Sequence, residues 1–224
     1  MPNIALAKGQ NHHETEHIKL GKVTLRGQID VPEGATGIVL FAHGSGSSRL
    51  SPRNQLVARI LRSGGLGTLL FDLLSEEEEQ MDMRTRHLRF DIKLLSERLM
   101  DAATWLESNP HTQNLKVGFF GSSTGGAAAL EAAAKHPDHV HAVVSRGGRP
   151  DLAGASLPKV KCPTLLIVGE RDETVLGLNR QALARLNCVK ELITIPGASH
   201  LFEEPGALEK VAVLAADWFK SRLV

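Results

Sequence analysis

A serine within a glycine-flanked pentapeptide is the first residue in this chain that could do chemistry. Residues 121–125 read Gly-Ser-Ser-Thr-Gly and fit the pattern G-x-S-x-G around Ser123. The largely apolar run before them predicts a short strand, and the alanine-rich residues 126–135 after them predict a helix. A serine on a sharp strand-to-helix turn exposes its hydroxyl at the edge of a sheet. We therefore predict that Ser123 is a nucleophile.

A serine hydroxyl needs a base that accepts its proton, and a histidine and an acid stand in suitable places. Asp172 follows one strand-like apolar run, and His200 lies in a loop after another. Loops at the carboxyl ends of parallel strands meet over one edge of the sheet. We predict that His200 is the base and that Asp172 orients its imidazole and stabilises its charged form. Glu170 and Glu173 are nearby acidic alternatives to Asp172.

The same chemistry needs two N–H groups that bind the negatively charged oxygen of the tetrahedral intermediate. One should come from Thr124, the residue after the nucleophile. The other should come from residues 43–46, His-Gly-Ser-Gly, with Ser45 as the predicted donor. Glycines there let the backbone approach a ligand closely. His43 could itself be catalytic, but we interpret it as a residue that holds this loop by hydrogen bonds.

The segments that must position these residues alternate between strand-like and helix-like patterns. The predicted strands lie near 18–31, 37–43, 67–73, 115–121, 141–147, 163–169 and 190–195, and the predicted helices near 52–63, 88–108, 124–136, 175–186 and 206–222. This alternation predicts an α/β fold with a mostly parallel central sheet and helices on both faces. The first strand-like segment alternates apolar and polar residues, as a half-exposed edge hairpin does.

Two connections bear on the access to the site. The four glutamates at 76–79 form the longest charge run, which we interpret as a solvated loop. The connection after 141–147 is short and carries Gly and Pro. We therefore expect no large cap domain and a rather open pocket.

Four motifs together resemble the α/β-hydrolase superfamily, and within it the small, capless dienelactone-hydrolase-like family. They lie at 43–46, 121–125, 169–172 and 197–200. The resemblance covers about residues 18–222 and implies the hydrolysis of an ester or lactone through an acyl-enzyme, with no cofactor and no metal. Dienelactone hydrolase itself uses a cysteine nucleophile where this chain has Ser123, which favours a general serine esterase. A thioesterase or another acyl hydrolase would use the same groups.

Length and composition restrict the remaining possibilities. We expect a polar leader at 1–17 and a single domain at 18–224, since 224 residues suit one domain. With 26 Lys and Arg against 25 Asp and Glu, no basic bias indicates nucleic acid. No run approaches the roughly 20 apolar residues that span a bilayer, and the start lacks the apolar core of a secretory signal. With Cys162 and Cys188 expected as free thiols, we predict a cytoplasmic protein whose partner is a small-molecule ester or lactone.

Three other functions fit the sequence less well than the hydrolase interpretation does. Residues 13–17 match the zinc-protease pattern H-E-x-x-H, but they directly precede a strand-like run, whereas that chemistry needs a helix and a third ligand. Residues 44–49 partly match a dinucleotide fingerprint, but the third glycine is missing and Pro52 interrupts the pattern. An inactive hydrolase-like binding module is the third alternative, and the intact serine, acid and histidine argue against it.

Four arginines are predicted to border the active edge of the sheet. Arg49 and Arg53 follow the proposed oxyanion loop, and Arg146 and Arg149 follow the strand next to the nucleophile strand. They either pair with local acids at the surface or bind an anionic group of the substrate, since arginine binds carboxylate and phosphate well.

Overall fold

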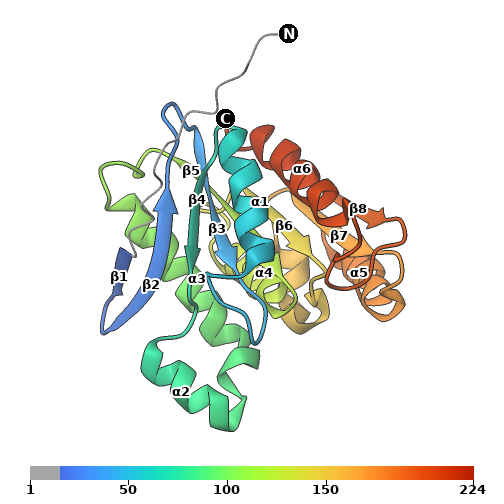
Figure 1. The fold of residues 1–224 in the computed structure, drawn as a ribbon, viewed down its shortest axis with the longest axis horizontal. Coiled ribbons are helices and arrows are strands. Elements are labelled where there is room, and N and C mark those ends of the chain that lie inside the picture. Colours follow the sequence, from blue (N-terminus) through green and yellow to red (C-terminus); the bar gives the residue numbers. More distant parts are fainter. Residues whose placement is uncertain (1–15) are drawn as a thin grey trace.

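The computed structural model describes residues 16–224, and in this part of the chain eight strands form one sheet in the order β1-β2-β4-β3-β5-β6-β7-β8 (Figure 1). The strands are β1 (Glu16–Leu20), β2 (Val23–Asp30), β3 (Gly37–Ala42), β4 (Gly67–Phe71), β5 (Lys116–Ser122), β6 (Ala142–Arg146), β7 (Thr164–Gly169) and β8 (Lys190–Ile195). Strands β3 to β8 are parallel, while β1 and β2 form an antiparallel hairpin at one edge. The mostly parallel sheet and its edge hairpin confirm the α/β prediction.

Helices cover both faces of this sheet. The helices are α1 (Pro52–Ser63), α2 (Glu76–Thr85), α3 (Ile92–Glu107), α4 (Thr124–Lys135), α5 (Glu173–Arg185) and α6 (Ala207–Lys220), with short 3-10 segments η1 (Leu88–Phe90) and η2 (Pro150–Lys159). On β3, Val39 and Phe41 pack with α1 and α6, whereas Ile38 and Leu40 pack with α3 and α4. Both faces of the central strands are therefore buried, which explains their uninterrupted apolar runs.

The turn between β5 and α4 depends on two glycines. A Cβ atom on Gly121 would lie 2.4 Å from the carbonyl oxygen of Gly125, and one on Gly125 would lie 2.0 Å from the carbonyl oxygen of Ala42. Both distances are too short for any side chain. The glycines of the pentapeptide thus allow α4 to start directly against β5 and β3. This close packing fixes the position of Ser123, which lies between the two glycines.

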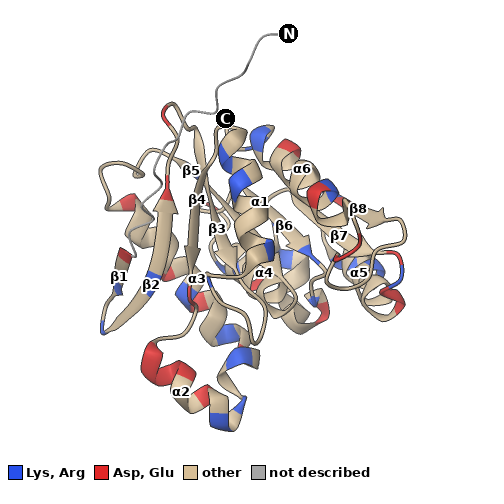
Figure 2. Cartoon of the chain, in the orientation of Figure 1, with Lys and Arg blue, Asp and Glu red and all other residues tan. Residues whose placement is uncertain are grey.

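The four glutamates at 76–79 form the first turn of α2, so the prediction of a solvated loop was wrong. Ser75 caps this helix: its hydroxyl accepts from the N–H of Glu78, and the Glu78 carboxylate accepts from the N–H of Ser75. Negative charges in a first turn also interact favourably with the helix dipole. The segment projects beyond the carboxyl ends of the parallel strands, at the bottom of Figure 1, and Figure 2 shows its acidic first turn in red.

The other boundaries lie close to the predicted ones, with one shift that has a local cause. Helix α3 begins at Ile92 rather than 88, because the Asp91 carboxylate caps it by accepting from the N–H of Leu94. Between β6 and β7 the chain forms only η2, and no cap domain is inserted there or elsewhere within the described residues. No helix in residues 16–224 is long and apolar enough to cross a membrane. Cys162 and Cys188 are both free thiols, as predicted.

Candidate active site

Ser123 occupies a strained backbone conformation at the turn between β5 and α4. Its φ of 51° and ψ of −121° fall outside the regions that non-glycine residues ordinarily adopt. Such strain persists only where the surroundings determine it. Here the N–H of Ser123 donates to the carbonyl oxygen of Arg146, and its carbonyl oxygen accepts from the N–H groups of Gly126 and Arg149.

This conformation selects one hydroxyl from three in a row. Ser122 and Thr124 are 2% and 3% exposed, whereas Ser123 is half-buried and reaches the surface at the carboxyl edge of the sheet. A Cβ atom on Gly44 would lie 3.0 Å from the Cβ of Ser123, so the proposed oxyanion loop passes directly beside it. The strand, turn and helix that the sequence predicted around Ser123 are all present.

His200 and Asp172 form a short hydrogen bond between the loops after β8 and β7. His200 Nδ1 lies 2.6 Å from Asp172 Oδ2. An ionised carboxylate only accepts, so Nδ1 carries the proton and Nε2 is left as the basic nitrogen. Of the acidic alternatives, Glu170 accepts instead from the N–H of Gly197 and so holds the histidine loop.

The imidazole also approaches the backbone beside Ser123. A Cβ atom on Gly147 would lie 3.5 Å from His200 Cε1, the ring atom next to Nε2. Gly147 directly follows Arg146, whose carbonyl oxygen accepts from the N–H of Ser123. The structure therefore brings the predicted nucleophile, base and acid to the same edge of the sheet.

The two predicted oxyanion donors contact each other. The N–H of Ser45 donates to the Thr124 hydroxyl over 3.0 Å, a contact that the sequence gave no reason to expect. His43 anchors the same loop: its Nε2 accepts from the N–H of Leu73, and its Nδ1 lies 3.0 Å from the carbonyl oxygen of Gly44. Burial lowers the pKa of His43, so this histidine is a neutral, structural residue, in line with our interpretation of it.

Two of the four arginines pair with acids. Arg49 Nη1 lies 2.5 Å from Asp72 Oδ2, and Arg149 contacts both oxygens of Asp151 at 2.9 and 2.7 Å. These two arginines fit the interpretation as ion-paired residues.

The other two arginines have weaker or no acidic partners. Among residues 16–224, the one acidic partner of Arg53 is the exposed Glu203, at 3.5 Å. Within the described residues, Arg146 forms no salt bridge, and its Nε and Nη1 atoms are buried without a hydrogen-bond partner. The structure thus divides the four arginines into two that pair closely with acids and two that do not.

A cleft lies between the oxyanion loop and the α2 segment. Its lining includes both proposed oxyanion donors and several apolar side chains: Ser45, Thr124, Leu73, Leu74, Met83 and Leu95. The α2 wall was missed because its glutamates were interpreted only as a charge run. The spacing of Ser75 and Glu78, which is that of a capping box, was the signal that predicts a helix there.

The residues behind the zinc and dinucleotide interpretations lie in different places: the H-E-x-x-H match is at the amino-terminal end of the chain, whereas residues 44–48 line the cleft. His17 lies on β1, a strand, and His13 lies outside the described residues. Residues 16–224 contain no group of three or more His, Cys, Asp or Glu side chains that could hold a metal ion. Pro52 is the first residue of α1, where its missing N–H costs nothing, so the expectation that this proline prevents a helix from beginning there was wrong.

The sheet order, the strained serine turn and the loops around it define an α/β-hydrolase fold. The model of the "Dienelactone hydrolase family" matches residues 30–221, and the chain belongs to this family. A dienelactone hydrolase from Anabaena variabilis ATCC 29413, known from a crystal structure, is 61% identical to this chain in sequence. The two structures superpose with a TM-score of 0.93 over 94% of this chain and 98% of the other. Est1E from Butyrivibrio proteoclasticus shares the fold at 15% identity, with coverage of 92% and 98% and a TM-score of 0.77.

Two curated proteins from Mycobacterium tuberculosis, strains CDC 1551 / Oshkosh and ATCC 25618 / H37Rv, are 56% identical over 210 residues. Their provisional name is phosphoribosyl transferase. The match covers 94% of this chain but 46% of each relative, so the chain spans about half the length of these proteins.

Proposed function

We propose that this chain is a serine hydrolase that cleaves small carboxylic esters or lactones through an acyl-enzyme. The observation that carries the proposal is the strained backbone of Ser123, with φ at 51°, on the turn between β5 and α4. Such strain in a non-glycine residue at a sheet edge points to function. The hydrogen-bonded His200 and Asp172 at the same edge supply the base that a serine nucleophile needs.

In the proposed reaction, Ser123 Oγ attacks the carbonyl carbon while His200 Nε2 takes its proton. The Asp172 carboxylate stabilises the imidazolium that forms, through its bond to Nδ1. The imidazolium then gives its proton to the leaving alkoxide, which departs as an alcohol, and an acyl-serine remains. A water molecule then attacks the acyl carbon while His200 takes its proton. The imidazolium returns this proton to Ser123 Oγ as the acyl–oxygen bond breaks, which releases the acid and regenerates Ser123 and His200.

The N–H groups of Ser45 and Thr124 are proposed to bind the oxyanion. In the structure the Ser45 N–H is bonded to the Thr124 hydroxyl, and the substrate oxygen has to replace that hydroxyl as its acceptor. The exchange favours the intermediate over the substrate, because a negatively charged oxygen accepts a stronger hydrogen bond than a neutral hydroxyl does.

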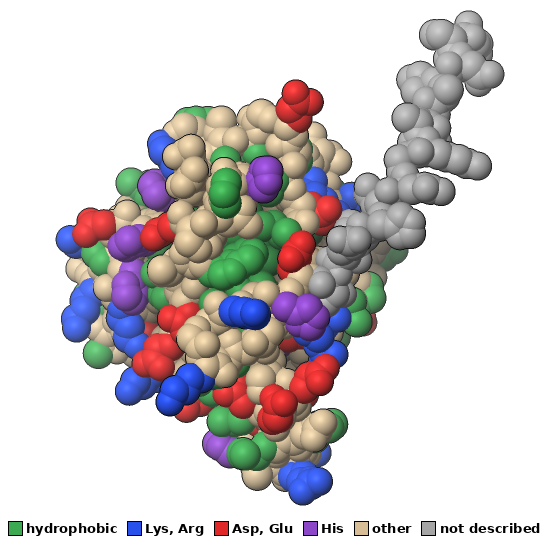
Figure 3. Space-filling view, turned by 90° about the vertical axis from the view of Figure 1, so that its left-hand side faces the viewer, with side chains coloured by type: hydrophobic (Ala, Val, Ile, Leu, Met, Phe, Trp, Pro, Cys, Tyr) green, Lys and Arg blue, Asp and Glu red, His purple; other side chains and the backbone are tan. Residues whose placement is uncertain are grey.

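The shape of the cleft supports small substrates. Its lining combines apolar side chains with charged ones, and residues of the short α2 segment form its outer wall. Figure 3 shows hydrophobic side chains on the segment that projects at the bottom of the molecule, where Met81, Met83 and Phe90 are exposed. A wall this short leaves little apolar surface to enclose a long acyl chain.

The name of the mycobacterial relatives does not change this proposal. Each relative is about twice as long as the segment that matches, so more than half of it lies outside the comparison. In this chain, residues 30–221 match the model of the dienelactone hydrolase family. The phosphoribosyl transferase name is therefore not carried over.

A fluorophosphonate probe tests the nucleophile directly. We expect it to label the wild-type protein and Ser122→Ala, and to leave Ser123→Ala unlabelled. Turnover of a small activated ester should fall by about 10⁴–10⁶ in Ser123→Ala. Labelling of Ser122, or unchanged turnover in Ser123→Ala, would overturn the proposal. Parallel assays with matched thioesters and lactones then establish which acyl group is preferred.

A further inference from the structure

Asn179 is a fully buried polar side chain in the middle of α5. Its Nδ2 atom donates to two carbonyl oxygens, that of Val175 at 2.8 Å and that of Gly148 at 3.0 Å. Carbonyl oxygens only accept, so the amide nitrogen is the atom that faces them. The bond to Val175 lies within the helix, whereas Gly148 belongs to the connection after β6, 31 positions away. Asn179 therefore ties α5 to that connection.

The connection after β6 supplies two of the backbone hydrogen bonds that hold Ser123. The N–H of Ser123 donates to the carbonyl oxygen of Arg146 at 3.4 Å, and the carbonyl oxygen of Ser123 accepts from the N–H of Arg149 at 3.0 Å. A further bond, from the N–H of Gly126, comes from the first turn of α4. Gly148 directly precedes Arg149, so a shift of Gly148 would pass directly to the backbone of the strained serine.

The same connection also packs against His200. Gly147 has a φ of 51°, and a Cβ atom there would lie 3.3 Å from the carbonyl oxygen of His200 and 3.5 Å from its Cε1. The N–H of Gly147 donates to the carbonyl oxygen of Ile167 on β7 at 2.7 Å. Gly148 thus lies between a residue that packs against the proposed base and Arg149, which bonds to the proposed nucleophile.

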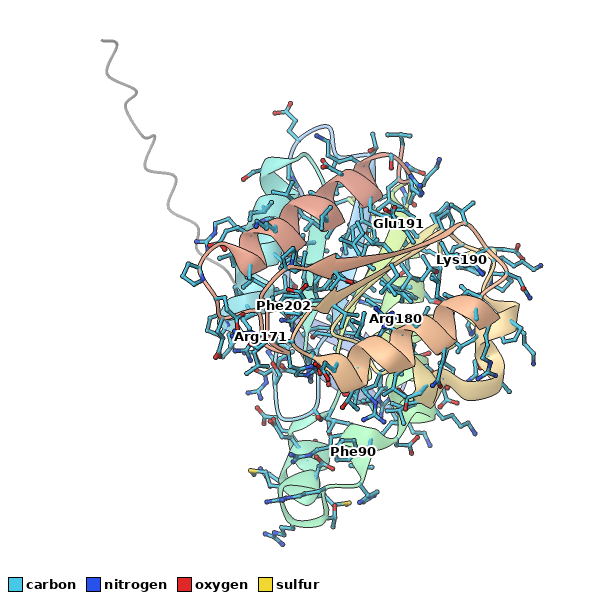
Figure 4. All side chains as sticks on the ribbon, turned by 90° about the vertical axis from the view of Figure 1, so that its right-hand side faces the viewer. Phe90, Arg171, Arg180, Lys190, Glu191 and Phe202 are labelled. Atoms are coloured by element: carbon cyan, nitrogen blue, oxygen red, sulfur yellow. The ribbon has the colours of Figure 1, made fainter. Side chains whose placement is uncertain are left out.

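Helix α5 carries the proposed acid at its start. Asp172 is the N-cap residue of α5, and its carboxylate lies 2.6 Å from Nδ1 of His200. Asn179 follows seven positions later, about two turns and roughly 10 Å along the axis, so both residues lie on one face of the helix. Figure 4 shows α5 starting near Arg171 at the carboxyl ends of the parallel strands and running back toward Lys190 at the start of β8. One helix therefore has connections to all three proposed catalytic residues.

We propose that Asn179 is a positioning residue, which keeps Ser123 in its strained conformation within reach of His200 by holding the carbonyl oxygen of Gly148. Backbone strain of this kind persists only while the surroundings determine it. Without the amide, the connection after β6 can move, and the backbone of Ser123 can relax and turn its hydroxyl away from His200 Nε2. This role rests on the proposed function, because it takes Ser123 as the nucleophile.

Asn179→Leu removes the donor and keeps most of the side-chain volume. For a small activated ester we expect kcat to fall by about 10–100-fold, since a small displacement of a reacting group costs that much, while KM changes by less than about twofold. KM is spared because Asn179 does not line the cleft beside the oxyanion loop. The rate constant for labelling of Ser123 by a fluorophosphonate should fall by a similar factor.

Thr112→Val is the matched control. Thr112 is also buried, and its hydroxyl donates to a backbone carbonyl oxygen, that of Leu106 at 2.7 Å, in the turn before β5 at the opposite end of the sheet. This variant should lower the melting temperature and leave kcat unchanged when it is assayed well below that temperature. Asn179→Ser is a second test variant, since a helical serine can bond to the carbonyl of Val175 but is too short for Gly148, and it should lose kcat as Asn179→Leu does.

The outcomes separate this role from a purely structural one. Wild-type kcat in folded Asn179→Leu and Asn179→Ser would overturn the inference, and so would an equal loss of kcat in Thr112→Val. Failure of both Asn179 variants to fold would also overturn it, because the residue would then serve the fold alone. Retained hydrolysis in Ser123→Ala would overturn the proposed function, whereas loss of hydrolysis there with normal turnover in Asn179→Leu would overturn only the role of Asn179.

Discussion

The backbone N–H of Ser45 donates to the side-chain hydroxyl of Thr124, so the two residues proposed to bind the oxyanion are bound to each other before substrate arrives. The bond joins the loop after β3 to the first turn of α4, across 79 positions in the sequence. This hydrogen bond holds the two sides of the proposed oxyanion hole together. It also occupies the Ser45 N–H, one of the two proposed donors.

Thr124→Val removes this acceptor and keeps the shape of the side chain. We expect the free energy of unfolding to fall by about 1–2 kcal/mol, since a partly buried N–H loses its partner. We expect kcat/KM for a small ester not to fall, because the oxyanion replaces the hydroxyl in the transition state. Urea denaturation and steady-state kinetics measure the two effects, with Thr124→Ser as the control that keeps the hydroxyl. A tenfold fall in kcat/KM would show that the hydroxyl itself acts in the transition state.

Asp172→Asn should lower kcat by about 10³–10⁴, because the amide cannot stabilise a charged imidazolium and favours the wrong tautomer of His200. Glu170→Gln is the matched control, since Glu170 lies in the same loop and contacts Gly197 rather than the imidazole. It should cost less than tenfold in kcat. The relevant measurement is kcat on a small activated ester at saturating concentration, and a larger loss in Glu170→Gln than in Asp172→Asn would reverse the assignment of the acid.

Met83→Ala should shift the acyl-length preference toward longer esters. Wild-type efficiency is expected to decline as the acyl chain lengthens, and removal of this wall residue should open room for one or two more carbons. The gain is limited to about 0.8 kcal/mol for each methylene that becomes buried. Met81→Ala is the control, because Met81 is exposed on the same helix but does not line the cleft. A series of p-nitrophenyl esters measures the profile, and identical profiles for the two variants would count against α2 as the wall.

His43 should make the protein less stable as the pH falls through its unfolded-state pKa of about 6.5. Burial lowers the folded-state pKa of His43, so the unfolded chain binds the proton more tightly, and the stability present above pH 6.5 is lost below it. His141 is shifted in the same direction, mainly by partial burial, and adds to the effect. Urea midpoints at pH 7.5 and 5.5 should differ less in His43→Gln than in wild type. An unchanged difference would assign the pH dependence to other groups.

Local sequence patterns were enough to predict the residues around the nucleophile. A Cβ atom at 121 or 125 would lie less than 3 Å from backbone atoms of α4 or β3, so the glycines of the pattern report a real packing constraint. The order of strands and helices followed from apolar periodicity, because strands buried on both faces have uninterrupted apolar runs. Helix α2 was missed, although its capping box at Ser75 and Glu78 was visible in the sequence.

The arginines mark the limit of such prediction. Arg149 pairs with an acid two positions away, which a local pattern indicates, but Arg49 pairs with Asp72 across 23 positions. Which of the four lacks a partner depends on the three-dimensional placement of every nearby acid. For the same reason, no pattern could reveal that Arg146 is buried beside Phe202.

Helix α2 is held to the rest of the molecule mainly by polar contacts. Asp82 is its one buried residue and bonds to Arg89, while Glu78 and Glu76 pair with Arg98 and Arg26. The apolar core therefore contributes little to its position, and its cleft-facing side chains can change without opening a cavity in the core. Substitutions of α2 residues at the cleft are therefore expected to cost little stability while changing the shape of the proposed substrate site. The edge that carries Ser123 is set instead by the close packing of β5 against α4, so changes in α2 leave it in place.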